Sequence, residues 1–548
     1  GTDGPLGGPG PPGRGLTVSS DPETSPAHLL RVLKQRFGFD GFRPHQEEII
    51  TAVLAGRDVF ASLPTGGGKS LCYQLPALMG DGLTLVVSPL ISLMKDQVDG
   101  AREDGIPAAF LNSTLSAEDA RQTWQALSSG GIRLLYVSPE RLSIPTFRDS
   151  LSRFGLKLIA VDEAHCISEW GHEFRPDYMR LGGQAEAVGA PVRLALTATA
   201  APPVRQEIVR RLGLREPEVV IGDFDRPHIA LSVRRLLTLP DKHRELVRAA
   251  GELAGPGIVY AATHADAQAA HDALVAAGEP VTLYHAGLSG RARHDAMTAF
   301  LGGSARIIAA TVAFGMGIDK PDVRWVLHFD PPPSLDAYYQ EMGRAGRDGG
   351  PSQARLLYRY EDFELARYLT AGSVSGAAVA RTAAALASGQ RAEPGTRQQT
   401  AALVRLADLG AVRWQADGEV RWTGAMSVAA ALAASDAQTQ REDEVERTRL
   451  TMMRRYAEHT GCRRSFLLSY FGQDYRGPCG NCDNDLAHAE AERAEVPFAV
   501  GTRVLSEHWG TGTVQRYDGD QVTVLFDEHG YRELFLPLVL QRGLLRPA

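Results

Sequence analysis

A glycine-rich segment between an apolar run and a region of helical patterning carries residue types that suit phosphate binding. Small glycines let backbone N–H groups close around a phosphate, where the N-terminus of a following helix adds a favourable dipole. The lysine would reach the β- and γ-phosphates of a nucleotide, and the serine would bind Mg²⁺. The strict pattern has a glycine where Leu63 stands, and an incidental glycine-rich turn is the alternative. The candidate nucleotide-binding residues are Thr65, Gly66, Gly67, Gly68, Lys69 and Ser70.

Two carboxylates and two arginines further along the chain suit phosphoryl transfer. Asp162 and Glu163 follow the apolar run 158–161, where one carboxylate can hold Mg²⁺ and its neighbour can orient or deprotonate the attacking water. Arg344 and Arg347 lie on one turn with glycine spacers, close to Gln340. A guanidinium inserted across a cleft stabilises charge on the transferring phosphoryl group. These residues therefore predict hydrolysis of a nucleoside triphosphate, against the alternatives of a solvated acidic loop and surface arginines.

The elements that must position these residues alternate short apolar runs with helical patterns, as buried parallel strands joined by crossover helices do. The pattern runs from about residue 26 to 214 and restarts near Phe224. Expected strands cover residues 83–87, 134–137, 158–161 and 192–196, and then 257–261, 281–284, 306–310 and 323–329. We therefore predict an α/β fold of two tandem RecA-like lobes with parallel sheets, residues 26–223 and 224–370. Their strand ends should present loops to a shared cleft.

The remaining segments differ in composition from the two lobes. Residues 1–25 are rich in Gly and Pro and predict a flexible tail. Residues 371–439 combine Ala-rich helices with two Val-Arg-Trp runs around a turn at Asp417-Gly418, which favours a winged-helix-like segment over a helical spacer with a hairpin. Residues 440–490 hold a cysteine cluster in a helical, metal-binding module. Residues 496–548 alternate short β runs with Gly turns, which indicates a small tudor- or SH3-like β-barrel.

The bulk properties narrow the classes of protein to consider. With 548 residues, 44% hydrophobic content and 22% charge, the composition is that of a globular protein of several domains. No run of ~18 apolar residues occurs, so no membrane span is expected. Five cysteines do not make a disulfide framework, and three of them fall within residues 462–482, which indicates metal binding in a reducing cytoplasm. The net charge of −7 requires any nucleic-acid contact to come from local grooves.

The chain resembles the RecQ family of superfamily 2 DNA helicases over roughly residues 29–485. Residues 37–46 resemble the family's adenine-recognition segment, residues 88–97 its strand-contacting motif and residues 196–200 its coupling motif. Residues 310–320 resemble its fifth motif, which lines both the cleft and the strand track. The resemblance implies that Phe39 and Arg43 stack on adenine while Gln46 hydrogen-bonds its edge. It also implies that Arg347 is the main arginine finger, with Arg344 beside it.

Residues 166–176 are the most specific part of this resemblance. They are similar to the aromatic-rich loop that separates RecQ proteins from other helicases, with Glu173 in place of the usual Asp. Aromatic faces there can stack on unpaired bases, and an arginine can meet phosphate. Without the family, the two large aromatic residues would more often be core residues. The residues expected to couple DNA to the ATP site are Trp170, His172, Phe174 and Arg175.

Three cysteines, Cys462, Cys479 and Cys482, match three of the family's four zinc thiolates, and Asp485 occupies the fourth position. Zinc accepts oxygen ligands, so three thiolates and a carboxylate form a reasonable tetrahedral site. His488 or water could complete the site instead, and thiols without a metal are a further alternative. Around this cluster, residues 447–476 carry seven arginines with interleaved aromatic residues, which suits a nucleic-acid groove.

The chain departs from the family pattern in two regions. Residues 260–264, Tyr-Ala-Ala-Thr-His, stand where family members usually show Cys and then Ser-Arg, which puts a second-lobe nucleotide or phosphate contact in doubt. The candidate wing precedes the zinc module instead of following it, and the chain ends in the barrel. Residues 501–548 carry five arginines and six acids, a balance that favours a protein partner over DNA. The barrel resembles the tudor-like domain of UvrD-type helicases, which implies RNA polymerase or a repair factor as that partner.

Together these features predict a helicase or translocase that requires ATP, Mg²⁺ and Zn²⁺ and acts in DNA repair or recombination. The resemblance alone implies 3′→5′ movement on single-stranded DNA, with unwinding of duplex or branched DNA, in the bacterial cytoplasm at the nucleoid. An RNA helicase is one alternative, against which the aromatic loop and the cysteines argue. A nucleotide-gated DNA-binding module without unwinding is the other, and intact Lys69, Glu163 and Arg347 make it less favoured.

Overall fold

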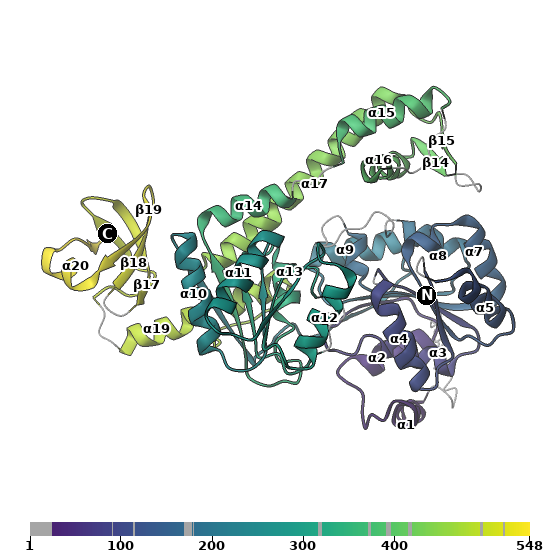
Figure 1. The fold of residues 1–548 in the computed structure, drawn as a ribbon, viewed down its shortest axis with the longest axis horizontal. Coiled ribbons are helices and arrows are strands. Elements are labelled where there is room, and N and C mark those ends of the chain that lie inside the picture. Colours follow the sequence, from purple (N-terminus) through teal and green to yellow (C-terminus); the bar gives the residue numbers. More distant parts are fainter. Residues whose placement is uncertain are drawn as a thin grey trace, which may run out of the picture.

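The computed structural model describes residues 25–548 except 90, 113–114, 169–177, 179, 316–319, 371–373, 391–395, 415–418, 494–496 and 519–520. Two α/β lobes lie next to each other, and a long helix leads from the second lobe to a small helical unit that lies above the first lobe in this view (Figure 1). A unit of antiparallel strands lies on the far side of the second lobe. Within the described ranges, no helix is long and apolar enough to cross a membrane. The predicted tail falls almost wholly outside the described residues.

The first lobe is built on a seven-stranded parallel sheet with the order β3-β4-β2-β5-β6-β1-β7. Alternate residues of β1 enter two different buried clusters, because the pleat points Phe60 to one face of the sheet and Val59 to the other. The strands are β1 (Val59–Ser62), β2 (Leu83–Val87), β3 (Ala108–Leu111), β4 (Leu134–Val137), β5 (Leu156–Val161), β6 (Val192–Thr197) and β7 (Glu218–Ile221). The helices are α1 (Pro26–Phe37), α2 (Gln46–Leu54), α3 (Leu71–Met79), α4 (Ile91–Glu103), α5 (Ala117–Ser128), α6 (Pro139–Leu142), α7 (Pro145–Leu151), α8 (Leu181–Ala187) and α9 (Pro202–Leu212).

The second lobe has a six-stranded parallel sheet with the order β10-β11-β9-β12-β13-β8. Its strands are β8 (Ile229–Arg235), β9 (Gly257–Tyr260), β10 (Val281–Tyr284), β11 (Ile307–Ala310), β12 (Trp325–His328) and β13 (Ser352–Tyr358). Its helices are α10 (Leu239–Glu252), α11 (His264–Ala276), α12 (Gly290–Leu301), α13 (Leu335–Met342) and α14 (Tyr360–Thr370). The two parallel-sheet lobes are confirmed, and the expected strands are found with ends that shift by up to about two residues.

Local sequence signals begin the helices that follow the strands. Thr263 caps α11, where its hydroxyl accepts the Asp266 N–H over 3.0 Å and donates to the Asp266 carboxylate over 2.6 Å. Thr238 and Asp241 repeat this arrangement at α10. Such reciprocal caps satisfy N–H groups that have no partner inside the helix. They fix the point at which α11 leaves the carboxyl edge of the second sheet.

The segment between the second lobe and the cysteines forms a small unit with its own core. It contains α15 (Gly376–Ala387), α16 (Arg397–Asp408) and a hairpin of β14 (Val412–Trp414) and β15 (Val420–Trp422), packed on the start of α17 (Val428–Ala457). Helices followed by a hairpin match the predicted winged-helix-like segment, although its turn at Asp417-Gly418 lies outside the described residues. Arg180 of the first lobe lies 3.3 Å from Asp408.

The cysteine module covers the open edge of the second sheet. It consists of the end of α17, α18 (Arg463–Tyr470) and α19 (Asp483–Arg493). The Leu231 N–H of the edge strand β8 donates to the Asn481 carbonyl over 3.1 Å, and the Val233 N–H donates to Asp483 over 2.9 Å. An uncovered edge strand would present unpaired backbone groups. The module therefore supplies hydrogen-bond partners for the backbone of β8 and packs as one unit with the second lobe.

The last unit is a five-stranded antiparallel sheet with the order β19-β18-β17-β16-β20. Its strands are β16 (Arg503–Ser506), β17 (Gly510–Asp518), β18 (Gln521–Phe526), β19 (Gly530–Phe535) and β20 (Arg546–Pro547), with α20 (Leu536–Arg542) between the last two. A separate core around Val514 and Val524 holds it together. Arg235, at the end of β8, stacks over the ring of Tyr531 at 4.1 Å and connects this unit to the second lobe.

Candidate nucleotide site and metal centre

The glycine-rich loop connects β1 to α3 at the carboxyl edge of the first sheet. Gly66 and Gly68 have φ values of +80° and +73°, which side-chain-bearing residues rarely adopt. A Cβ on Gly68 would lie 2.3 Å from the Nε2 of Gln46, so glycine is also required for space. The Gly67 N–H donates to the Pro64 carbonyl over 2.8 Å and tightens the loop. Ser70 and the preceding lysine, Lys69, thereby stand at the start of α3, where they fit phosphate and Mg²⁺.

The segment expected to recognise adenine folds onto this loop. Gln46 Nε2 donates to the Gly68 carbonyl over 2.9 Å, while its Oε1 accepts the Arg43 N–H over 2.8 Å. Arg43 Nη1 donates to the Gly66 carbonyl. A cavity of about 600 Å³ lies beside Arg43, and the ring of Phe39 is 51% exposed, which leaves its face accessible for stacking. The structure therefore brings Arg43 and Gln46 to the phosphate loop, with the Gln46 amide engaged by the loop itself, while the adenine-stacking role of Phe39 stays a prediction.

The two carboxylates follow β5 next to the phosphate loop. Burial and the neighbouring Glu163 raise the pKa of Asp162 to about 6, although the charge of Lys69 opposes this shift. Glu163 has a φ of +47°, an uncommon conformation for a residue other than glycine and one that concentrates at functional sites. Lys69, Asp162 and Glu163 therefore lie in one polar region, in which the carboxylate oxygens are donors that suit Mg²⁺.

A short chain of contacts connects Glu163 to the expected coupling motif. His165 is buried, and its Nδ1 lies 3.3 Å from a Glu163 carboxylate oxygen and 3.0 Å from the Thr197 hydroxyl. Burial alone would lower the pKa of His165, but the Cys166 and Glu163 side chains outweigh it and raise that pKa. The Thr197 hydroxyl also donates to the Thr199 carbonyl over 2.9 Å. A shift in the 196–200 segment would therefore be felt at the Glu163 carboxylate.

The aromatic loop lies almost entirely outside the described residues, which include none of the four predicted coupling residues, Trp170, His172, Phe174 and Arg175. Its first three residues, and Tyr178 shortly after it, are described. Near the start of the loop, the Ser168 hydroxyl donates to Glu207 of α9 over 2.5 Å. After it, the Tyr178 hydroxyl donates to the Asp162 carbonyl over 3.2 Å. The described residues on either side of 169–177 are therefore held in place, Ser168 by Glu207 and Tyr178 by the Asp162 carbonyl.

The second-lobe residues of the predicted cleft have different surroundings. Gln340, near the end of α13, and Arg347 are half-buried. Arg344 is only 7% exposed, and its Nη1 donates to the Gly315 carbonyl within its own lobe. This contact holds Arg344 against the end of the described part of the 310–320 segment. The expected role of Arg347 as the main arginine finger stays a prediction.

Sequence reasoning missed Arg226, which connects the two lobes at the phosphate loop. Its Nη2 donates to the Thr65 carbonyl. It also lies beside Tyr339 of α13. Burial raises the pKa of Tyr339, and a hydrogen bond from Arg226 offsets part of this rise. The Tyr339 hydroxyl donates to the Phe224 carbonyl over 2.7 Å. A lone arginine at the start of the second lobe gives no motif, so no sequence signal could have found this contact.

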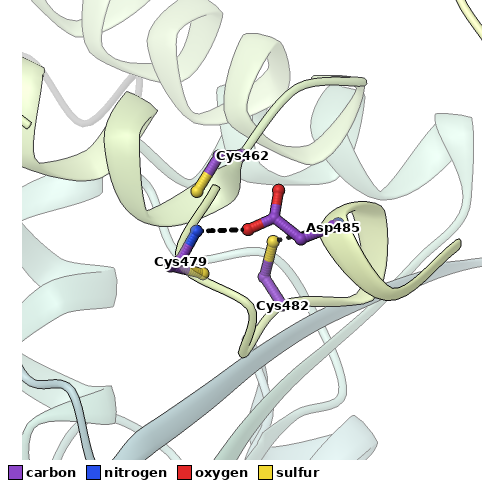
Figure 2. A group of neighbouring side chains, drawn as sticks. All are labelled: Cys462, Cys479, Cys482 and Asp485. Atoms are coloured by element: carbon purple, nitrogen blue, oxygen red, sulfur yellow. Dashed lines mark hydrogen bonds between the residues drawn. The ribbon is translucent and has the colours of Figure 1, made fainter. Parts of the chain in front are cut away.

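The cysteine cluster gathers four donor atoms. The sulfurs of Cys462, Cys479 and Cys482 and a carboxylate oxygen of Asp485 all lie within 4.8 Å of one another. Figure 2 shows the four side chains gathered around one point. Three thiolates and one carboxylate are donors that zinc binds in tetrahedral sites. The residues present therefore fit a zinc ion.

The fourth position of this cluster is held by Asp485. Its Oδ2 accepts the Cys479 N–H over 2.6 Å (Figure 2). It also accepts the Gly480 N–H over 3.1 Å, and the two bonds orient the carboxylate. His488 Nε2 lies 3.2 Å from the Thr460 carbonyl and is not part of the cluster. The geometry thus favours the carboxylate over the histidine as the fourth ligand.

The arginine-rich run around the cluster is largely neutralised by its own surroundings. Arg449, Arg454, Arg463 and Arg464 pair with Glu446, Glu458, Asp483 and Asp225 respectively. Among the interleaved aromatic residues, Tyr456 is fully buried and Tyr470 donates to Asp336 over 2.5 Å. These side chains fasten the module to the second lobe. The predicted nucleic-acid groove along residues 447–476 stays a prediction with weaker support.

Three family profiles match successive parts of the chain. They describe a DEAD/DEAH box helicase over residues 43–208, a helicase conserved C-terminal domain over 241–349 and RecQ zinc-binding over 425–486. The last matches α17, α18 and the start of α19, including all four donor residues. The order of the three profiles agrees with the order of the two lobes and the cysteine module.

Curated relatives are similar over most of the chain. The ATP-dependent DNA helicase RecQ of Pasteurella multocida is 38% identical over 83% of this chain and 61% of its own length. The protein of that name in Bacillus subtilis is 34% identical over 92% of this chain and 75% of its own length. A probable ATP-dependent DNA helicase RecS of Bacillus subtilis is 43% identical over 62% and 68%. The chain spans about three fifths of the Pasteurella and Haemophilus influenzae relatives, 61% and 63%.

Solved structures with a similar fold have far lower identity. The DUF1998 helicase MrfA bound to DNA superposes with a TM-score of 0.52 at 17% identity, over 73% of this chain and 60% of that one. The Mycobacterium smegmatis helicase Lhr, bound to single-stranded DNA and AMP-PNP, gives 0.51 at 20% identity over 74% and 61%. These similarities show the tandem-lobe fold.

Proposed function

Because the chain belongs to the RecQ family, we propose that it is an ATP-dependent helicase that moves 3′→5′ on single-stranded DNA. It would unwind duplex or branched DNA during repair or recombination. The observation that carries this proposal is the polar region where Lys69, Asp162 and Glu163 meet, with its contacts to Thr197 in one direction and to the second lobe in the other. Such an arrangement can hydrolyse ATP and transmit the result to other parts of the molecule.

Each residue of the site has a task in hydrolysis. Lys69 and the N–H groups of the glycine loop bind the phosphates, and Ser70 and Asp162 would hold Mg²⁺. Bound Mg²⁺ supplies charge neutralisation on the phosphates and the leaving group. Glu163 orients the attacking water and accepts its proton, and His165 keeps that carboxylate in place. Arg347 compensates the charge on the transferring phosphoryl group when the lobes close.

Coupling to DNA is assigned to the aromatic loop. Its C-terminal flank is bound to the Asp162 backbone and its N-terminal flank to α9. A base stacked on Trp170 or Phe174 would pull on these flanks, and therefore on the Mg²⁺-binding carboxylate. Arg175 would contact a phosphate, and His172 would lie between the loop and the ATP site. Support for this assignment is the position of the flanks.

We assign a stabilising role to the cysteine module and a partner-binding role to the terminal β unit. A zinc ion at the cysteine cluster would hold the module on β8 and so stabilise the second lobe. The terminal β unit, with its nearly balanced charge, would bind a protein such as RNA polymerase or a repair factor. A cytoplasmic location close to the nucleoid agrees with the bacterial relatives.

A DNA-stimulated ATPase assay, with DNA and RNA compared, separates this proposal from its alternatives. We expect strong stimulation by single-stranded DNA, little by RNA, and strand separation of a duplex with a 3′ overhang. Equal stimulation by RNA would indicate an RNA helicase. Nucleotide-dependent DNA binding without turnover would indicate a gated binding module.

Two variants test the site itself. Lys69→Ala should abolish turnover, because the phosphates lose their mobile cation, whereas Glu163→Gln should bind ATP but lose hydrolysis. Lys34→Ala is the matched control, since Lys34 is exposed and pairs only with Asp40 at 2.7 Å. Turnover near the wild-type rate in either site variant would overturn the assignment.

A further inference from the structure

A cavity of about 530 Å³ lies where the terminal β unit meets the second lobe and the cysteine module. The second lobe contributes Arg235 at the end of β8 and Tyr358 at the end of β13. The cysteine module contributes the turn after α17, and the terminal unit contributes residues of β17, β18 and β19. Small-molecule sites have volumes of about 300–1,000 Å³ and often form between units of a chain. The cavity therefore has the size and the position of a ligand site, and none of the described ATP-site residues lines it.

Tyr358 places a buried polar group at the wall of this cavity. The side chain is only 3% exposed, and its ring packs edge-on against Phe363 at 5.5 Å. Burial raises the pKa of the Tyr358 hydroxyl, the charge of Glu458 adds to this rise and that of Arg235 opposes it. Since Glu458 and Arg235 also line the cavity, the hydroxyl lies at its wall. Within the described ranges this hydroxyl has no hydrogen-bond partner, although buried polar groups normally have one.

Two guanidinium groups of the cavity lack a carboxylate partner among the residues that the structure describes. Arg235 stacks over the Tyr531 ring at 4.1 Å, a contact that uses its face and leaves its N–H donors free at the edge. Arg532 is exposed and donates to the Tyr531 carbonyl over 2.9 Å. The other charged side chains of the cavity are compensated in pairs, Arg463 by Asp483, Arg516 by Glu533 and Glu458 by Arg454. The cavity therefore has an excess of two positive charges.

We propose that this cavity binds a nucleoside monophosphate, whose phosphate accepts hydrogen bonds from Arg235, Arg532 and the Tyr358 hydroxyl. Arginine forks match the geometry of phosphate oxygens. A phosphate monoester carries about 1.5 to 2 negative charges near pH 7, which matches the two uncompensated arginines. The cavity has room for more than the phosphate, and Gln515 and Gln521 offer amide donors and acceptors to the rest of the ligand. The ligand contacts the second lobe and the terminal unit together, so it holds one against the other.

The test measures binding of GMP to the full chain by titration calorimetry. We expect about one GMP per chain, and Lys69→Ala should keep this binding because the cavity is separate from the ATP site. Arg235→Gln should weaken the binding about tenfold or more, since a charge-assisted hydrogen bond is lost. Tyr358→Phe removes only the hydroxyl and should weaken it about fivefold. Loss of GMP binding in Lys69→Ala would assign the nucleotide to the ATP site and overturn the inference.

Arg532→Gln gives a second variant at an exposed position, which should fold like the wild type and also lose about tenfold in affinity. Arg503→Gln is the matched control, because Arg503 belongs to the same unit, pairs with Asp527 at 2.5 Å and does not line the cavity. Saturating GMP should raise the unfolding temperature of the wild type and of the control more than that of Arg532→Gln.

Three results would show that the inference is wrong. The first is wild-type GMP affinity in both Arg235→Gln and Arg532→Gln, with unfolding curves that show folded protein. The second is an absence of GMP binding to the wild type up to about 1 mM. The third is binding of inorganic phosphate as tight as that of GMP, which would identify a site for free anions. DNA-stimulated ATP hydrolysis is measured separately, so each of these results leaves the proposed function standing.

Discussion

The Asp485 carboxylate has two roles in the cysteine cluster, so its removal should weaken zinc binding for two separate reasons. It supplies the fourth donor, and its Oδ2 accepts the N–H groups of Cys479 and Gly480 over 2.6 and 3.1 Å. The N–H of the half-buried Cys479 costs about 1–3 kcal/mol when it is left unsatisfied, whereas the exposed Gly480 N–H can bond water instead. Asp485→Ala should therefore bind zinc at least about fivefold more weakly than the wild type.

Three further substitutions separate these tasks. Asp485→Asn keeps an oxygen for the two N–H groups but carries no charge, so its affinity should be intermediate. Asp485→Cys supplies a soft thiolate and should bind zinc more tightly. His488→Ala should behave like the wild type, because His488 faces the Thr460 carbonyl. The assay is the rate of zinc release from the full chain to a chromogenic chelator, after metal analysis has shown about one equivalent.

Loss of the metal should also loosen the edge of the second sheet. The Leu231 N–H bonds the Asn481 carbonyl inside the cluster loop, so hydrogen exchange at Leu231 should rise in Asp485→Ala. Wild-type zinc retention in Asp485→Ala, combined with rapid release from His488→Ala, would refute the ligand assignment. An absence of zinc from the freshly purified wild type would show that the cluster consists of thiols without a metal.

Three other expected outcomes follow from the site. Arg226→Ala should lower kcat/KM for ATP about tenfold or more, because a charge-assisted bond between the lobes is lost. Arg226→Lys should recover only part of this kcat/KM. Unchanged kinetics in both variants would mean that the contact is incidental. Burial raises the pKa of Asp162 to about 6 from 3.8, so its ionised form destabilises the fold by up to about 3 kcal/mol above pH 6 without Mg²⁺, and this penalty fades as the pH falls toward 4. Asp162→Asn should therefore unfold at a higher temperature than the wild type in chelator near pH 7.5 but not near pH 4, while losing turnover; equal melting at both values would contradict the buried charge. Trp170→Ala should keep basal ATPase activity while DNA stimulation and unwinding fall together, and intact stimulation would mean that the loop is structural.

Local chemistry made much of the fold and the nucleotide site predictable from the sequence. The central strands of both lobes are short and mainly apolar because they are buried on two faces, so runs such as Leu134–Val137 could be recognised individually. Gly66 and Gly68 are needed for backbone conformations that depend on their own φ angles. The carboxylates Asp162 and Glu163 follow directly from a strand that ends at Val161. Each of these features is specified by neighbours within a few residues.

Contacts between distant segments were decided only by the tertiary structure, because they depend on where folding brings a side chain and on how far it is buried. Arg226 reaches the carbonyl of Thr65 across 161 residues of sequence. The seven arginines of residues 447–476 suggested a nucleic-acid groove, but carboxylates from other elements neutralise two of them, Arg463 and Arg464. Asp485 and His488 both follow the cysteines closely in sequence, and helix α19 turns only the carboxylate toward them. Spacing along the chain carries no information about such distances, since the same spacing serves different folds.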